Sequence, residues 1–88
     1  MHFRLDIIND KGLHARASAK FVETVERFDA RVTVRRDGME VSGDSIMGLM
    51  MLAASYGTHI DVETSGAEEE AVAEALKALV AGRFGEKS

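Results

Sequence analysis

Residues 31–42 read RVTVRRDGMEVS, and this stretch decides the fold. Val32 and Val34 alternate with polar residues, which is typical of a strand with one buried face. The dipeptide Asp37-Gly38 indicates a two-residue turn, because both residues tolerate the positive φ angles that such turns require. The alternation resumes with Val41 on the far side of the turn. The stretch therefore predicts a β-hairpin in the middle of the chain.

On both sides of this hairpin, apolar residues no longer alternate with polar ones but recur every three or four residues, as in a helix. The preceding helix is expected to start near Ala15 and to end near Phe28, and the following helix to start after Ser45, a capping residue, and to end before Gly57. The residues that share one face are Phe21, Val22, Val25 and Phe28 in the first helix, and Ile46, Leu49, Met50 and Ala53 in the second.

Further outward, the period of two returns. Residues 3–7 and 60–62 alternate between apolar and polar side chains and predict two more strands. A third helix follows, with three glutamates at 68–70 in its first turn, where the helix dipole favours negative charge. Its apolar stripe consists of Val72, Leu76, Leu79 and Val80.

The predicted order is β-α-β-β-α-β-α, and it fixes the fold class. One-sided strands and one-sided helices bury their apolar faces together only if all helices cover the same side of the sheet. We therefore expect an α+β, two-layer, open-faced sandwich, with a four-stranded antiparallel sheet and three helices on one face. With 88 residues and no internal repeat or linker, residues 1–88 are expected to form one domain.

The composition excludes several functional classes. Fifteen acidic against eleven basic side chains give a net charge of −4, which argues against a nucleic-acid binder. The basic run 31–36 is better explained as a solvated sheet face. The absence of cysteine excludes disulfides and thiol chemistry. Residues 46–56, the longest mostly apolar stretch, are fewer than the roughly 20 that span a membrane, and the charged N-terminus does not resemble an export signal. We expect a cytoplasmic protein without metal or cofactor.

His14 is the candidate for chemistry. It lies between the loop 10–13 and the start of the first predicted helix, so its imidazole is placed at the positive end of a helix. The N–H groups of the first turn have no acceptor within the helix and favour an anion such as phosphate. These donors would be the backbone N–H groups of Ala15, Arg16 and Ala17. Arg16 also offers a guanidinium suited to phosphate oxygens, and it is the only charged group that we expect near His14.

Other interpretations of the histidines stay open at this point. By position alone, a histidine at a helix start is more often an ordinary N-terminal residue than a functional one. His2 and His59 occupy polar positions of the predicted strands and are expected to be exposed. A free-standing hydrolase is disfavoured, because no carboxylate pair, metal-ligand cluster or activated serine occurs at a useful spacing.

Ser45 and the apolar segment after it form the second feature. If Ile46, Leu49 and Leu52 point inward, Met47 and Met51 point outward and could dock onto partners. The alternative, equally supported by composition, is that the methionines fill gaps in the core. A phosphate on Ser45 would be favoured by the helix N-terminus, although an N-cap serine needs no such function.

Two motifs resemble the HPr family, the histidine-containing phosphocarriers of the bacterial phosphotransferase system. The first is Gly12-Leu13-His14-Ala15-Arg16 followed by residues 19–22, and the second is Asp44-Ser45-Ile46-Met47-Gly48-Leu49-Met50. The resemblance covers nearly the whole chain and implies the HPr fold. It also implies a carrier that is not a stand-alone enzyme.

The resemblance further implies roles for single residues. His14 would be phosphorylated on Nδ1 by an enzyme I-type donor, Arg16 would assist, and an enzyme IIA-type acceptor would receive the phosphoryl group. Ser45 matches a position that an HPr serine kinase/phosphatase modifies in some bacteria. The docking surface for partners would include Ala15, Ala19, Ile46, Met47 and Met50.

Two departures bear on the pathway. Ala17 stands where sugar-type members usually carry proline, and it restores a backbone N–H; this is similar to the nitrogen-related branch. Asp44 replaces a lysine common in the family and reduces the positive charge of the docking face. The sequence leaves open the sugar or nitrogen pathway, the identity of the acceptor and the use of Ser45. A regulatory module that acts through Ser45 and Met47 without turnover at His14 is the alternative, and a monomer is expected.

Overall fold

The hairpin that decides the fold forms as predicted. In the computed structural model, which describes residues 1–88, the turn residues Asp37 and Gly38 have φ angles of 50° and 80°, as a tight hairpin turn requires. The elements follow the predicted order, with one additional 3₁₀ turn, η1, near the C-terminus. Their bounds are β1 His2–Asp6, α1 Ala15–Glu26, β2 Arg31–Arg36, β3 Met39–Ser42, α2 Ile46–Met51, β4 His59–Ser65, α3 Glu69–Ala81 and η1 Arg83–Gly85.

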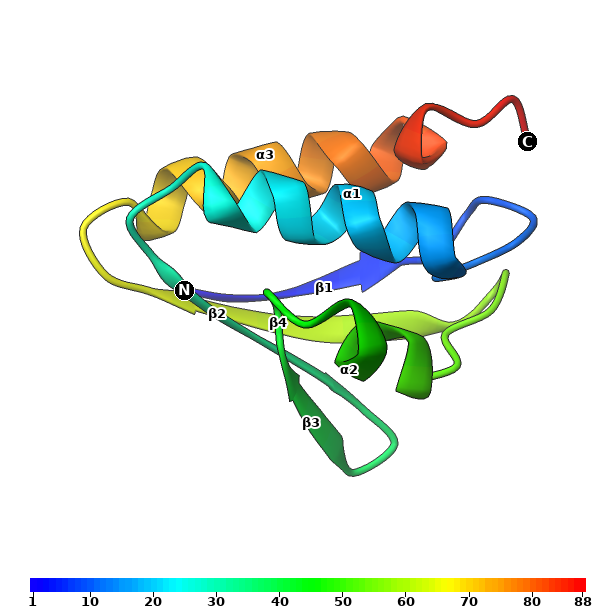
Figure 1. Cartoon of the computed structure of the whole chain (residues 1–88), viewed down its shortest axis with the longest axis horizontal. Helices are drawn as coiled ribbons and strands as arrows, with labels where there is room; N and C mark the ends of the chain where they lie inside the picture. The colour runs from blue at the N-terminus through cyan, green and yellow to red at the C-terminus, as the bar shows by residue number, and fades with distance from the viewer.

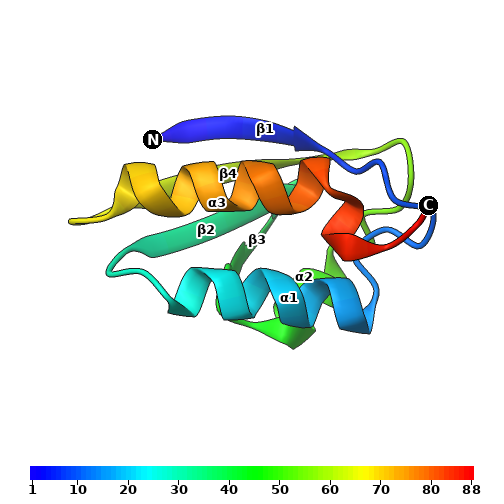
Figure 2. The ribbon, with the colours of Figure 1, turned by 90° about the horizontal axis from the view of Figure 1, so that it is seen from above.

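The four strands form one antiparallel sheet in the order β1-β4-β2-β3. Inward-facing residues meet across it, with Leu5 opposite Ile60 and Val34 opposite Val62. All three helices lie on one face of this sheet, and Figures 1 and 2 show α1 and α3 running side by side above the strands. The predicted open-faced sandwich is therefore confirmed.

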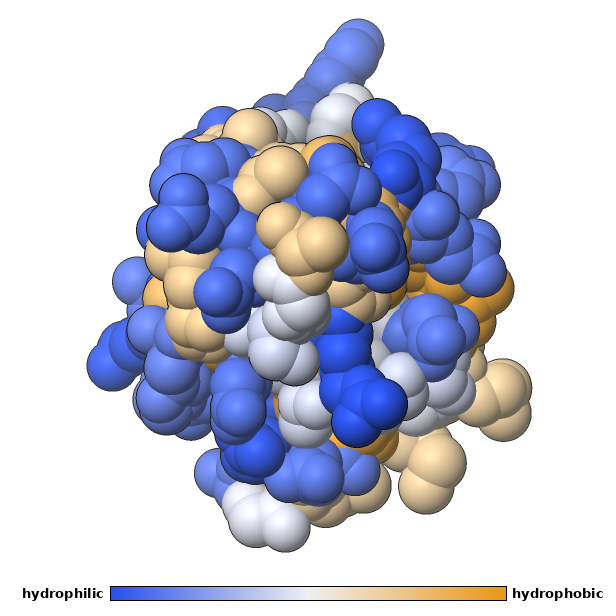
Figure 3. Space-filling model, turned by 90° about the vertical axis from the view of Figure 1, so that its left-hand side faces the viewer, coloured by the Kyte–Doolittle hydropathy of each residue, from blue (hydrophilic) through white to orange (hydrophobic).

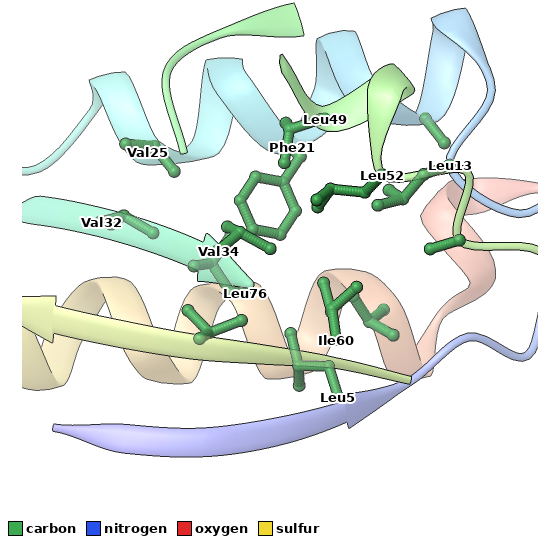
Figure 4. Packing of buried hydrophobic residues seen from close by; sticks show 14 of the residues in the cluster. Leu5, Leu13, Phe21, Val25, Val32, Val34, Leu49, Leu52, Ile60 and Leu76 are labelled. Carbon is green, nitrogen blue, oxygen red and sulfur yellow. The ribbon is translucent and has the colours of Figure 1, made fainter. Parts of the chain in front are cut away.

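Phe21 of α1 occupies the centre of the core. Its side chain is fully buried and points between α2 and the sheet, close to Leu49, Leu52 and Val34 (Figure 4). Replacing such a buried aromatic with alanine typically costs about 3–5 kcal/mol of stability. This packing fixes the start of α1, and with it His14, relative to α2.

The second helix differs from its prediction in its length and in its buried face. Of the residues expected on one apolar face, Ile46 is 41% exposed and Met50 is 39% exposed, and Ala53 is exposed and lies beyond the helix end at Met51, with a φ of 52°. The physical reason is that a six-residue helix reaches the core through a single turn, which supplies Leu49 and the following Leu52. Met47 and Met51 are 70% and 63% exposed, so of the two alternatives left open by the sequence the outward position holds for them. The exposed side chains of the segment are Ile46, Met47, Met50 and Met51.

The end of the molecule where α1 finishes and α3 begins has a different surface. Figure 3 shows that this end is covered mainly by hydrophilic residues, with hydrophobic ones scattered among them. No helix of the structure is both long and apolar enough to cross a membrane.

Candidate functional site

The loop before α1 holds His14 in place through its backbone. Gly12 has a φ of +62°, and a Cβ atom there would lie 2.3 Å from the carbonyl oxygen of Ala54. The next residue, Leu13, is buried and donates its backbone N–H to that same oxygen at 2.9 Å. Because the loop is bonded to the segment after α2, His14 has a defined position at the start of α1.

His14 is the N-cap residue of α1, in extended conformation, with a side chain that is 28% exposed. The first helical hydrogen bond runs from the N–H of Ser18 to the carbonyl oxygen of His14. No carbonyl of the chain accepts a hydrogen bond from the N–H groups of Ala15, Arg16 or Ala17. Ala15 and Arg16 are exposed, whereas Ala17 is buried. The arrangement leaves helix donors beside the imidazole, where an anion is favoured.

Arg16 forms no hydrogen bond or ion pair inside the protein, so its guanidinium is free to meet an incoming group. Together with His14 and Lys11, it lines a hollow of about 360 Å³ that opens to solvent. Asp10 and residues 85–88 line the rest of this hollow. A cation without a partner, next to a half-buried imidazole, suits the binding of a phosphate.

Glu86 is the site residue that the sequence did not reveal. Its Oε2 lies 2.5 Å from Nε2 of His14, and its Oε1 accepts a hydrogen bond from Nδ2 of Asn9 at 3.1 Å. Asn9 is fully buried and also donates to the carbonyl oxygen of Gly12 at 2.9 Å. The prediction that Arg16 is the only charged group near His14 was therefore wrong. Glu86 is 72 residues away from His14 in the chain and follows the last helix, so no local pattern signals the contact.

The electrostatics of Glu86 follow from these contacts. Burial alone would raise the pKa of its carboxyl group. The hydrogen bonds from His14 and Asn9, with the attraction of His14 and Lys11, outweigh burial and lower that pKa below its ordinary value. The side chain of Glu86 is thus a carboxylate at neutral pH, and it can only accept hydrogen bonds.

Ser45, the other predicted site residue, caps α2. Its Oγ accepts the backbone N–H of Gly48 at 3.0 Å, and the residue is half-buried. His2 and His59 are exposed, as predicted, and no group of three or more histidine or acidic side chains is arranged to hold a metal ion.

The residues predicted for docking lie on the two helices nearest to His14. Ala15 is exposed at the start of α1, Ala19 is half-buried one turn later, and the exposed apolar side chains of α2 stand on the neighbouring helix. Figure 1 shows α2 close to the first half of α1, and the two helices are in contact. Ala15, Ala19, Ile46, Met47 and Met50 are called the α1–α2 surface below.

Known proteins share this sequence and fold. The sequence model of the family described as "PTS HPr component phosphorylation site" matches residues 1–82. The phosphocarrier protein HPr of Neisseria meningitidis serogroup A is 52% identical over 82 residues, which cover 93% of this chain and 92% of that protein. The phosphocarrier protein NPr of Proteus mirabilis is 38% identical over 84 residues, 94% of this chain and 93% of that protein. The crystal structure of HPr-C-His from Thermoanaerobacter tengcongensis has a TM-score of 0.95 at 36% identity, and the match covers 100% of this chain and 99% of that one.

The fold, with one histidine at a free helix N-terminus, and these matches define the class of molecule: a small phosphocarrier. The chain belongs to the HPr family of the bacterial phosphotransferase system.

Proposed function

We propose that this protein accepts a phosphoryl group on Nδ1 of His14 from an enzyme I-type donor and passes it to an enzyme IIA-type acceptor. The observation that carries the proposal is the position of His14, which is partly exposed at the unpaired N-terminus of α1 in a chain of the HPr family. The half-exposed ring is accessible to a partner, and the donors behind it suit the incoming group.

The transfer is an in-line displacement in which positioning and electrostatics supply most of the rate. The bond between phosphorus and a nitrogen of the donor breaks as the bond to Nδ1 of His14 forms. The N–H groups of Ala15, Arg16 and Ala17, which have no backbone acceptor, are the donors for the phosphoryl oxygens, and Ala15 and Arg16 are exposed residues. The guanidinium of Arg16, which has no partner in the resting protein, balances the developing charge.

Partners dock on the α1–α2 surface. Met47 is 70% exposed, Ile46 is 41% exposed and Met50 is 39% exposed. Flexible thioether side chains adapt to more than one partner, which a carrier between two proteins requires. Because the same face serves both partners in turn, we expect a monomer.

Labelling with phosphate tests the proposal. Incubation with phosphoenolpyruvate and an enzyme I is expected to add one acid-labile phosphate, which is absent in His14→Ala. His59→Ala is the matched control, since His59 is equally a histidine but is exposed on β4. Labelling of His14→Ala at the wild-type level would refute the assignment.

The acceptor decides the pathway. The relative named HPr is 52% identical and the one named NPr is 38% identical, whereas Ala17 resembles the nitrogen-related branch. The phosphorylated protein should be mixed in parallel with acceptor domains from the sugar and nitrogen branches. The branch whose acceptor removes the phosphate from His14 at the higher rate is the pathway of this carrier.

A second candidate function is a regulatory module that acts through Ser45 and Met47. The observation in its favour is that Ser45 is partly exposed at the start of α2, beside the exposed Met47, where a kinase of the HPr serine kinase/phosphatase type could modify it. If this is the main function, Ser45→Asp changes the affinity for a partner, and His14→Ala leaves the biological output intact. Loss of output in His14→Ala would favour the carrier.

A further inference from the structure

The segment after α3 is folded back onto the loop before α1. Figures 1 and 2 both place the C-terminal end of the chain beside that loop. Phe84 is fully buried in the core, and its carbonyl oxygen accepts a hydrogen bond from Nζ of Lys20 at 2.6 Å. These contacts bring Glu86, two residues further on, to the imidazole of His14.

The backbone of this segment has an uncommon conformation. Arg83, Phe84 and Gly85 have φ angles of 54°, 55° and 78°, all in the left-handed region. Two of the three are not glycine, so the turn is unfavourable for an isolated chain. The buried ring of Phe84 and the Lys20 contact hold the turn, which fixes the direction in which Glu86 leaves it.

When the imidazole is neutral, the proton of the hydrogen bond between Glu86 and His14 can be bound to only one of the two residues. A carboxylate accepts hydrogen bonds only, so Nε2 of His14 must carry the proton that Glu86 accepts. In a neutral imidazole the other ring nitrogen is then an acceptor. No group of the protein donates to Nδ1 of His14, so its lone pair is free.

We propose that Glu86 is a positioning residue: it holds the Nε2 proton of His14 and so keeps Nδ1 as the free nucleophile for the phosphoryl donor. The proposal rests on the function proposed above. It also accounts for the charge of the product. A ring that carries phosphorus on Nδ1 and a proton on Nε2 has a formal positive charge, and the carboxylate of Glu86 stabilises that charge. No proton has to move during the transfer.

Asn9 makes this arrangement testable. Its Nδ2 uses one proton for the carbonyl oxygen of Gly12 and another for Oε1 of Glu86, while its buried Oδ1 has no partner. A flipped amide would place Oδ1 against two acceptors, so the amide of Asn9 is fixed with its nitrogen toward Glu86. A group at position 86 therefore has to present an acceptor to Asn9.

This constraint predicts an unusual order of variants. In Glu86→Gln, the amide oxygen has to face Asn9, so the amide nitrogen faces Nε2 of His14. An amide nitrogen donates, and it selects the imidazole with its proton on Nδ1, which blocks attack. In Glu86→Ala the ring has no partner and both tautomers are available. Glutamine, although nearly identical in shape, should be worse than alanine.

The first measurement is ¹⁵N NMR of the imidazole of His14, at a pH where the ring is neutral. In the wild type, the proton of the neutral ring is expected on Nε2. In Glu86→Gln it is expected on Nδ1, and in Glu86→Ala a mixture of both tautomers is expected. Glu74→Gln is the control, because Glu74 is exposed on α3 and pairs only with Lys77 at 3.7 Å. An unchanged tautomer in Glu86→Gln would overturn the proposal, whatever the transfer rate.

The second measurement is the rate of phosphorylation by enzyme I under the same conditions. Glu86→Ala should be slower by on the order of tenfold, the effect of one lost hydrogen bond to a charged group, and Glu86→Gln slower still. A purely structural role would make glutamine the milder change, and equal rates in wild type and Glu86→Gln would overturn the proposal. If the wild type takes no phosphate on His14, the proposed function fails instead, and the NMR result alone decides whether Glu86 orients the ring.

Discussion

At the scale of single residues, Gly12 allows the close backbone contact that fixes the position of His14. Its left-handed φ angle alone makes alanine unfavourable by about 1–2 kcal/mol. A Cβ atom would also collide with the carbonyl oxygen of Ala54, which orients the neighbouring Leu13. The position of His14 therefore depends on the absence of a side chain two residues earlier.

Gly12→Ala is expected to lower the free energy of unfolding by more than Gly38→Ala. Both glycines have a positive φ angle, +62° and +80°, but a Cβ at Gly38 would meet nothing within 4 Å. The comparison separates the cost of the backbone conformation from the cost of the collision. Urea denaturation of both variants measures it, and equal losses would show that the contact with Ala54 does not matter.

The lowered pKa of Glu86 predicts how stability depends on pH. The folded protein holds the carboxylate more strongly than the unfolded chain, whose glutamate pKa is about 4.3. The stability that wild type has over Glu86→Gln should therefore be fully present above about pH 4.5 and be lost as the pH falls through the lower, folded pKa. Urea denaturation between acidic and neutral pH measures the difference. The difference between wild type and Glu74→Gln should not vary in this way.

The site was only partly predictable at this scale. His14 and Arg16 could be chosen as candidates, because they stand two residues apart at a predicted helix start, in a motif that resembles the HPr family. Glu86 could not, because a left-handed turn at residues 83–85 brings it to His14 and Asn9, and no periodicity marks such a turn.

At the scale of elements, α2 depends strongly on its cap. It has six residues, too few to be stable alone, and its N-terminus is closed by Ser45. Ser45→Ala should lower the free energy of unfolding by about 0.5–2 kcal/mol, whereas Ser45→Asp keeps an acceptor for the Gly48 N–H and should cost less. Thermal or urea denaturation measures this. Ser65→Ala, at the exposed end of β4, should stay within about 0.5 kcal/mol of wild type.

The elements themselves could be predicted where their period was regular. The apolar face of α1 and the Asp37-Gly38 turn came out as expected, because burial on one side and a positive φ angle both leave local marks in the sequence. Ile46 was placed wrongly, since the length of a helix decides which of its turns reaches the core, and the helical period contains no information about length. The exposure of Met47 could not be decided from the sequence, because composition supported docking and core filling equally.

At the scale of the whole molecule, the α1–α2 surface places exposed apolar side chains on the two helices next to the imidazole of His14, while the far end of the protein is mainly hydrophilic (Figure 3). Met47→Lys is expected to raise the KM for the phosphoryl donor by roughly five- to tenfold, the effect of losing more than 1 kcal/mol of binding energy at a central contact. Met39→Lys is the control, because Met39 is 39% exposed on β3, outside this surface. Equal KM values for both variants would place docking elsewhere.

The sheet order also has a consequence for how the protein is made. Of the four strands of this sheet, β1 is synthesised first, yet it pairs only with β4, which begins at residue 59. The nascent chain therefore holds β1 without its partner strand until β4 has been synthesised. The imidazole of His14 lacks its carboxylate partner for still longer, since Glu86 is added after every helix and strand of the fold. Translation thus completes the candidate site only after the helices and strands of this fold, and a shortened product that stops after α3 would carry His14 without its carboxylate neighbour.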